Sequence, residues 1–206
     1  MKRIAGVLMA AVAVALLTAC QDGNSVPTPV GAATTTGTVP GAVQPSVGTQ
    51  VPGTTAGGDG APATAGNGKC VDLKSPVVTA ALGKIGKSVG GNAFVAYSGT
   101  DASIGSCPAL LWVLADTAGG TASSPWHLML FNHAGFLGTA TSHWTAYTSV
   151  SGSSDRSVQV EYRWLAAKDA SCCPTGGPVI VTLTLGADGH TVTPDRDFPT
   201  EVINPK

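Results

Sequence analysis

The sequence predicts an α+β domain: a mainly antiparallel sheet of six to seven strands with one N-terminal helix packed on it, preceded by a disordered linker. Three observations lead to this fold class. All eleven aromatic residues lie between Phe94 and Phe198, so the capacity to build a core sits in the last two thirds of the chain. There, one short helical period is followed by runs of β-branched and aromatic residues, punctuated by Gly, Ser, Asp and Pro. Ahead of them, small and turn-forming residues dominate.

Residues 1–19 have the order of a secretory signal peptide. Two basic residues are followed by an uncharged apolar run from Ile4 to Leu17, and then by Thr18-Ala19-Cys20. The apolar run would rise only about 21 Å as a helix, which is short of a hydrocarbon core of about 30 Å. We therefore expect a lipoprotein signal peptide at 1–19 rather than a stable transmembrane anchor.

The four residues from Leu17 to Cys20 resemble the bacterial lipobox, in which a small residue precedes a cysteine that becomes lipid-modified and N-terminal after cleavage. The resemblance implies a diacylglyceryl thioether on Cys20, with fatty acids such as palmitate. Two acyl chains hold a protein on a membrane firmly, whereas one chain binds only marginally. Cys20 is thus expected to tether the protein to the outer face of the cell membrane. The alternative is an ordinary thiol after an ordinary signal cleavage.

Residues 20–68 are expected to form a lipidated, disordered tether. Of the 48 residues from 21 to 68, 35 are Gly, Pro, Thr, Ala or Ser, none is aromatic, and only Asp22 and Asp59 are charged. Such a segment cannot bury enough apolar surface to offset the entropy lost on ordering. The globular domain is therefore expected at 69–206.

A helix of about ten residues is predicted near the start of this domain. Ser75 is a favoured N-cap residue, Pro76 suits the first helical position, and apolar residues recur with helical spacing as far as Ile85. We expect the helix to end near Gly86.

The rest of the domain is predicted to be mainly sheet. Residues 110–115 and 126–131 are apolar on both faces, as in central strands that are covered on two sides. Residues 157–164 alternate between apolar and polar side chains, which indicates a strand with one solvated face.

Two hairpins are predicted from turn residues. Residues 132–135 have the composition of a four-residue loop that leads into 136–141. The turn at 187–189 joins residues 179–185 to 190–193. An antiparallel sheet with the helix packed on it is the simplest arrangement that buries the apolar faces of these elements.

Besides Cys20 the chain has four cysteines, and export to an oxidising compartment predicts two disulfides among them. Spacing leaves two patterns open: Cys70–Cys107 with a vicinal Cys172–Cys173 bridge, or two long-range bridges from the first two cysteines to the adjacent pair. Vicinal bridges are rare, which favours the second pattern. A metal site built from the adjacent pair and a histidine is a third interpretation, but it lacks C-x-x-C spacing.

Charge and motifs exclude several functions. The chain has 11% charged residues and a formal net charge of −1, which excludes a basic nucleic-acid binder. It contains no G-x-S-x-G elbow, no H-E-x-x-H motif, no phosphate-cradling glycine loop and no calcium-loop spacing. We expect no metal and no cofactor.

Three side chains are candidate binding residues: His133, His143 and Arg163. His133 is placed at the tip of a predicted hairpin and His143 beside Trp144 just after a strand, so a shared pocket requires the loop to fold back. Surface or hydrogen-bonded histidines are the simpler interpretation. Arg163 shares one face of its strand with Glu161, and both are expected to pair with neighbours across the sheet.

Several motifs together resemble those of a known family. They are Cys107-Pro108 before a Leu-Trp-Val strand, Ser124-Pro125, LMLFNHAGFLGTATS at 128–142 and YRWLAAKDASCCPTGGP at 162–178. In combination they resemble the LppP/LprE lipoprotein family of actinobacterial cell envelopes. The resemblance implies an exported envelope lipoprotein with no established reaction. It also gives weight to a Cys70–Cys107 bridge, because some members keep these two cysteines without the adjacent pair, so both bridge patterns stay open.

We therefore expect an exported, lipid-anchored cell-envelope protein whose domain is a non-enzymatic binding or structural module. Its expected partners are the membrane, through the lipid on Cys20, and an envelope protein, glycan or lipid. Nucleic acid is not expected. The alternative is an envelope hydrolase or transferase with an unrecognised arrangement of serine and histidine. A concave pocket with converging polar side chains favours the enzyme, and a flat solvated sheet favours the binding module.

Overall fold

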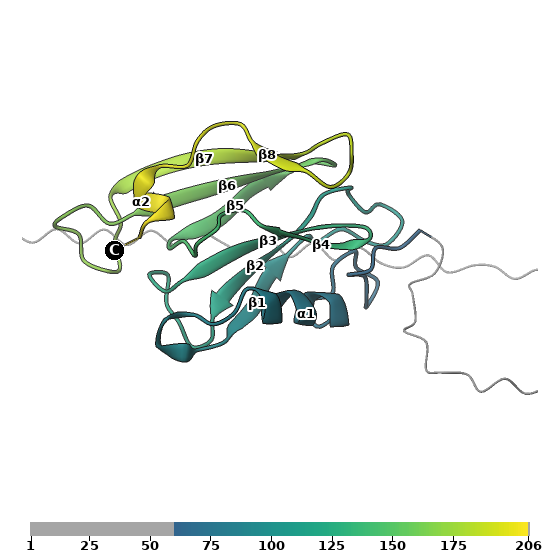
Figure 1. Cartoon of the computed structure of the whole chain (residues 1–206), viewed down its shortest axis with the longest axis horizontal. Helices are drawn as coiled ribbons and strands as arrows, with labels where there is room; N and C mark the ends of the chain where they lie inside the picture. Colours follow the sequence, from purple (N-terminus) through teal and green to yellow (C-terminus); the bar gives the residue numbers. More distant parts are fainter. Residues whose placement is uncertain (1–59, 206) are drawn as a thin grey trace, which may run out of the picture. The chain divides into compact units, whose positions relative to one another are not determined.

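In the computed structural model of the protein, residues 60–205 are described. They form eight strands in two four-stranded antiparallel sheets, two α-helices and a 3-10 turn, η1 (Val89–Gly91) (Figure 1). The expected signal peptide at 1–19, Cys20 and most of the tether lie outside the described residues. Neither of the two described α-helices is long and apolar enough to cross a membrane.

The first sheet is a meander in which each strand pairs with the one before it. Its strands are β1 (Phe94–Gly99), β2 (Leu111–Thr117), β3 (Trp126–Asn132) and β4 (Gly135–Thr139). Strands β2 and β3 are buried along most of their length. This confirms the prediction that both strands are central and covered on two sides.

The second sheet is also a meander. Its strands are β5 (Thr148–Ser153), β6 (Ser157–Trp164), β7 (Gly176–Leu185) and β8 (Val192–Pro194). On β6, Val158, Val160 and Tyr162 are buried while Gln159 is exposed, so the predicted strand with one solvated face is confirmed.

The described part of the chain has three layers (Figure 1). The two sheets pack face to face around a core that includes Leu114, Leu128 and Val160. Helix α1 (Pro76–Lys84) covers the other face of the first sheet, where Val78 packs in a second core with Phe131. The short helix α2 (Thr200–Ile203) packs against β6.

Helix α1 forms where its local signals predict it. Ser75 caps the helix by accepting a hydrogen bond from the Val78 N–H (3.3 Å), and Pro76 takes the first position. The helix ends at Lys84, and Gly86 leaves it with a φ of 79°, a conformation that glycine adopts at no steric cost.

The expected single sheet of six to seven strands is instead two sheets of four. The chain changes sheet within residues 140–147, where Thr145 and Trp126 exchange backbone hydrogen bonds of 2.7 and 2.9 Å. Just beyond, Tyr147 has a positive φ of 49°. Alternation along a strand shows that one face is solvated, but it does not identify the layer that covers the other face. Sequence periodicity therefore did not separate the two sheets.

Two strands and one loop differ from the prediction. Strand β1 was missed because it exposes Val95 (43%) and Tyr97 (64%), and β5 was missed because it consists mostly of serine and glycine. The β3–β4 loop has two residues rather than four, since Asn132 pairs with Gly135. The Asn132 carboxamide oxygen tightens this turn by accepting the N–H groups of Ala134 and Gly135, each at 2.9 Å.

The folded part begins earlier than the composition indicates. The Ala63 N–H donates to the His133 carbonyl (2.8 Å). Thr64 is fully buried, and its hydroxyl donates to the Cys70 carbonyl (2.7 Å). Residues 61–68, which were assigned to the tether, therefore pack against the domain. Composition hides this because the contacts come from backbone groups and from a few small or polar side chains, among them Thr64 and Asn67.

Candidate functional site

A hollow of about 670 Å³ opens where the end of β1, the start of β2 and the β5–β6 turn approach one another. Its lining combines hydroxyl and carboxylate side chains with one indole ring, that of Trp112. The polar lining side chains are those of Thr100, Asp101, Ser106, Ser153, Ser154 and Asp155.

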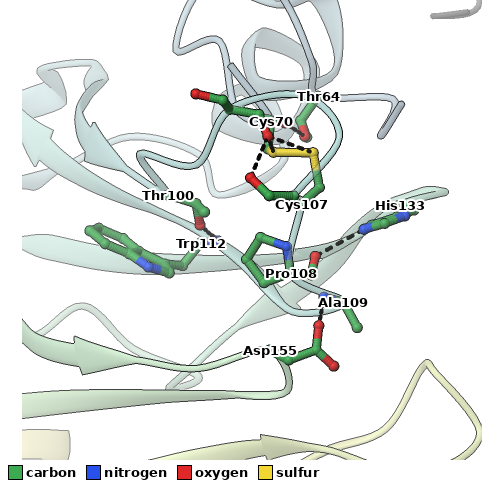
Figure 2. Close-up of a disulfide and its surroundings, with 11 residues drawn as sticks. Thr64, Cys70, Thr100, Cys107, Pro108, Ala109, Trp112, His133 and Asp155 are labelled. Carbon is green, nitrogen blue, oxygen red and sulfur yellow. Dashed lines mark hydrogen bonds between the residues drawn. A yellow bond between two sulfur atoms is a disulfide. The ribbon is translucent and has the colours of Figure 1, made fainter. Parts of the chain in front are cut away.

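The first wall of the hollow is formed by residues 100–108 of the β1–β2 loop. The disulfide between Cys70 and Cys107 fixes this loop to the segment that precedes α1, with the two Cα atoms 5.5 Å apart (Figure 2). At the surface, Lys69 Nζ lies 2.6 Å from Asp101 Oδ1. The wall is thus held by a covalent bond and an ion pair near its two ends.

The second wall is the β5–β6 turn, which Asp155 joins to the start of β2. The Asp155 carbonyl accepts the N–H of Leu110 (2.9 Å), and its Oδ1 accepts the N–H of Ala109 (3.0 Å) (Figure 2). No residue in 60–205 donates a hydrogen bond to Asp155 Oδ2. One carboxylate oxygen is therefore used to dock the two sheets, and the other is available.

Trp112 supplies the aromatic surface of the hollow. Its backbone N–H donates to Thr100 Oγ1 (2.9 Å), and its carbonyl accepts the Thr100 N–H (3.0 Å). The side chain is partly exposed and also packs against the core between the sheets. Within the described residues the indole N–H is buried without an acceptor.

The chemistry of the lining is that of hydrogen-bond acceptors. Of the described residues that line the hollow, two carry carboxylates and none carries a histidine, lysine or arginine side chain. Asp101 forms an ion pair with Lys69. Among residues 60–205, the Asp155 side chain accepts a hydrogen bond only from the Ala109 backbone N–H. The hydroxyl groups can donate as well as accept.

The cysteines follow the first of the two bridge patterns. Cys70 bridges Cys107, and Cys172 bridges Cys173, with Cα atoms 3.8 Å apart in the vicinal pair. Within residues 60–205, no group of three or more His, Cys, Asp or Glu side chains gathers as a metal site. The vicinal pair lies in the exposed β6–β7 loop, away from the residues that line the hollow.

Asp169 organises that loop. Its carboxylate accepts the N–H groups of Thr175 and Ala166, each at 2.7 Å, and these hydrogen bonds lower the pKa of Asp169. The Tyr147 hydroxyl donates to the Ser171 carbonyl, which ties the loop to the connection ahead of β5. The cysteine pair thus sits in a loop with an internal hydrogen-bond frame.

The three candidate binding residues lie in separate places. His133 adjoins the hollow, since its Nε2 lies 2.9 Å from the carbonyl oxygen of Pro108 (Figure 2). His143 is exposed after β4. Arg163 Nε donates to Glu161 Oε1 (2.9 Å) on its own strand, rather than pairing across the sheet as expected. Residues two apart share a face of a strand, and here the long side chains reach along it.

His127 is a buried histidine on β3. It is 7% exposed, and its ring packs edge-on against Phe94 with the ring centroids 5.0 Å apart. Burial lowers the pKa of His127, and the charge of nearby His143 lowers it further. Within the described residues its Nδ1 has no hydrogen-bond partner. The folded protein therefore favours the neutral imidazole.

Sequence reasoning did not identify the hollow. Asp101 and Asp155 belong to loops of different sheets and share no motif, and Trp112 lies within residues 110–115, which were predicted to form a strand covered on two sides. The local signal that was available is Asp155 itself, an acidic residue between serines and an arginine. That pattern is too common to indicate a site.

The fold and the hollow define a disulfide-bonded β-sandwich domain with a helix on one face and an open, acceptor-rich site. Residues 103–187 match the model of a family described as LppP/LprE lipoprotein, which confirms the resemblance seen in the sequence motifs. This segment of the chain is therefore similar to the LppP/LprE lipoproteins. It includes Cys107, Trp112 and Asp155.

Mycobacterial relatives carry the same family name. Proteins named as lipoprotein LppP in Mycobacterium bovis and in two strains of Mycobacterium tuberculosis are each 34% identical to this chain over 80 residues. The match covers 39% of this chain and 45% of each relative, so the chain spans less than half the length of these relatives. No solved structure matches the chain.

Proposed function

We propose that the protein is a cell-envelope lipoprotein, anchored by lipid on Cys20 at the outer face of the cell membrane, whose domain is a non-enzymatic binding module. The LppP/LprE segment at 103–187 supports association with the envelope. The hollow with its acceptor-rich lining is the observation that carries the binding role.

The lipid anchor is tested with Cys20→Ala. Because the thiol of Cys20 is the expected acceptor of the diacylglyceryl group, we expect the variant to incorporate no labelled fatty acid. The protein should then be released from the membrane or retained as an unprocessed precursor. Cys172→Ala is the matched control and should be labelled normally. Labelling of Cys20→Ala at the wild-type level would contradict the assignment.

The lining supports a binding role over a serine–histidine enzyme. Nucleophilic catalysis needs a hydroxyl within hydrogen-bond reach of a general base. Here the Ser106 hydroxyl donates to the Ser103 carbonyl (3.0 Å), and the Ser154 and Ser157 hydroxyls bond to each other (2.8 Å). His133 contacts a backbone carbonyl rather than a hydroxyl. The concave shape alone suits both functions, so these contacts are what favour binding.

A photo-crosslinking experiment tests the site. A diazirine-bearing amino acid replaces Ser154 in the hollow, or Thr184 on the exposed face of the second sheet, in full-length protein in a bacterium that processes lipoproteins. Irradiation should give a discrete mass adduct at position 154 and none at 184. Equal adducts at both positions, or none at either, would overturn the binding role of the hollow. Catalytic conversion of the captured compound by purified protein would establish the hydrolase or transferase alternative instead.

A further inference from the structure

The charge of the hollow excludes several ligand classes. This inference rests on the proposed binding function. Asp155 brings negative charge to the lining, whereas Asp101 is paired with Lys69 outside it, and no described lining residue carries a cationic side chain, which disfavours phosphate and other anions. A divalent cation is also disfavoured, because no group of three or more acidic, histidine or cysteine side chains gathers in residues 60–205.

The carboxylate and hydroxyl groups of the lining disfavour a lipid chain. An acyl chain requires a long apolar surface, because each CH₂ group stabilises the complex only when it leaves water for an apolar environment. Six of the ten residues that line the hollow carry a carboxylate or a hydroxyl group, and these groups interrupt its apolar surface, to which Trp112 and Pro108 contribute the largest side chains. Covering these polar groups with hydrocarbon would leave them without partners.

We propose that the hollow binds a neutral carbohydrate, with one face of a sugar ring against Trp112 and the ring hydroxyls hydrogen-bonded to Asp155 and the surrounding hydroxyl side chains. A sugar ring combines hydroxyl donors on its rim with apolar C–H groups on its faces. The lining offers the complement: carboxylate acceptors, hydroxyls that donate and accept, and one indole surface.

The site is preorganised for such a ligand. The Asp155 backbone is held by the hydrogen bond from Leu110 to its carbonyl, and the Ala109 N–H, which donates to Oδ1, orients the carboxylate. Trp112 is fixed by its paired backbone hydrogen bonds with Thr100 and by the core beneath it. Groups that are already ordered lose little entropy on binding. The volume of about 670 Å³ lies within the range of about 300–1,000 Å³ that is typical of small-molecule sites.

Asp155→Asn separates ligand binding from folding. The Asn carboxamide oxygen can still accept the Ala109 N–H, while the free carboxylate oxygen becomes an NH₂ donor. Trp112→Phe keeps an aromatic ring in the core but reduces the stacking surface. Asp197→Asn removes the same charge from an exposed residue outside the hollow and is the matched control.

The test is isothermal titration of the full-length protein in detergent with neutral tetrasaccharides: α-1,4- and α-1,6-linked glucose, α-1,6-linked mannose and β-1,4-linked N-acetylglucosamine. Glucosamine and glucuronic acid serve as charged comparisons. We expect at least one neutral tetrasaccharide to bind, and Asp155→Asn to weaken it by at least about tenfold, since hydrogen bonds to charged groups contribute about 1.5–3 kcal/mol. Trp112→Phe should also weaken binding, and Asp197→Asn should leave it unchanged.

The outcomes distinguish this inference from the proposed function. Binding that is equal in Asp155→Asn and wild type, or binding of glucosamine alone, overturns the carbohydrate proposal. If no neutral tetrasaccharide binds while position 154 still yields a crosslinked adduct, the carbohydrate class is wrong and the binding site stands. If neither experiment gives a signal, both the ligand class and the proposed function are wrong. Unchanged melting temperatures of the variants confirm that the fold is intact.

Discussion

Among cysteine-to-serine substitutions, Cys107→Ser should lower the stability of the domain most. The bridge of Cys107 to Cys70 closes a loop of 37 residues. In the chain-entropy model, such a loop raises the free energy of unfolding by about 3–4 kcal/mol, because the cross-link restricts the unfolded chain. Cys107→Ser should lose this contribution, which urea denaturation of the oxidised protein measures.

The vicinal pair provides the control for Cys107→Ser. Cys172 and Cys173 are adjacent and exposed, so their bridge closes no long loop, and Cys172→Ser should change the free energy of unfolding by less than about 0.5 kcal/mol. Each variant should show one free thiol after denaturation. If Cys107→Ser and Cys172→Ser are equally stable, the entropic role of the long bridge is refuted.

His127 should make stability depend on pH below neutrality. Burial lowers the pKa of His127 in the folded state, so the unfolded chain binds a proton more readily. Stability from this residue is therefore complete above the unfolded histidine pKa of about 6.5 and is lost as the pH falls below it. Each tenfold difference in proton affinity between the two states contributes about 1.4 kcal/mol.

His127→Phe tests this dependence. The variant keeps a ring against Phe94 but has no group to protonate, so its free energy of unfolding should fall less between pH 7 and pH 5 than that of the wild type. Thr79→Ala, at an exposed position of α1 without a titratable group, should keep the wild-type slope. Identical slopes for His127→Phe and wild type would show that another group causes the acid sensitivity.

Helix α1 depends on its cap. Ser75 is buried and satisfies the Val78 N–H, so Ser75→Ala should lower the free energy of unfolding by about 1 kcal/mol. Thr79→Ala, on the exposed face of the same helix, should be neutral or slightly stabilising, because alanine is the better helix former. Urea midpoints measure both. A Ser75→Ala midpoint equal to that of the wild type would mean that solvent replaces the cap without cost.

The helix and strands that carry local sequence signals, such as a cap residue or a regular apolar pattern, were predicted. Strands that lack such signals were not. Helix α1 has an N-cap, an N-terminal proline and periodic apolar residues within one short segment, and β6 alternates cleanly. Strand β5 has no such signal, because its serines and glycine form a strand only through pairing with β6. Strand β1 exposes Tyr97, which packs on Trp126 with centroids 5.2 Å apart, so tertiary contact rather than alternation sets its pattern.

At the scale of the whole molecule, the hollow arises from docking that no single segment encodes. Asp155 contributes to it only because the β5–β6 turn reaches the start of β2, and Asp101 only because the Cys70–Cys107 bridge holds its loop. The sequence motifs did predict the similarity of residues 103–187 to the family model, and the Cys70–Cys107 bridge is one of the pairings that spacing left open. The motifs did not predict the division into two sheets, and the hollow depends on that division.

The boundary between tether and domain gives the last prediction. Deleting residues 21–59 should leave the melting temperature unchanged, because the composition of that segment predicts no contribution to a core. Deleting 21–68 also removes the buried Thr64 and its hydrogen bonds with Cys70 (2.7 Å) and Asp72 (2.8 Å). That deletion should lower the free energy of unfolding by about 2–4 kcal/mol. Thermal and urea unfolding of the two lipidated deletion variants compare them directly, and equal stabilities would place the start of the domain at residue 69 after all.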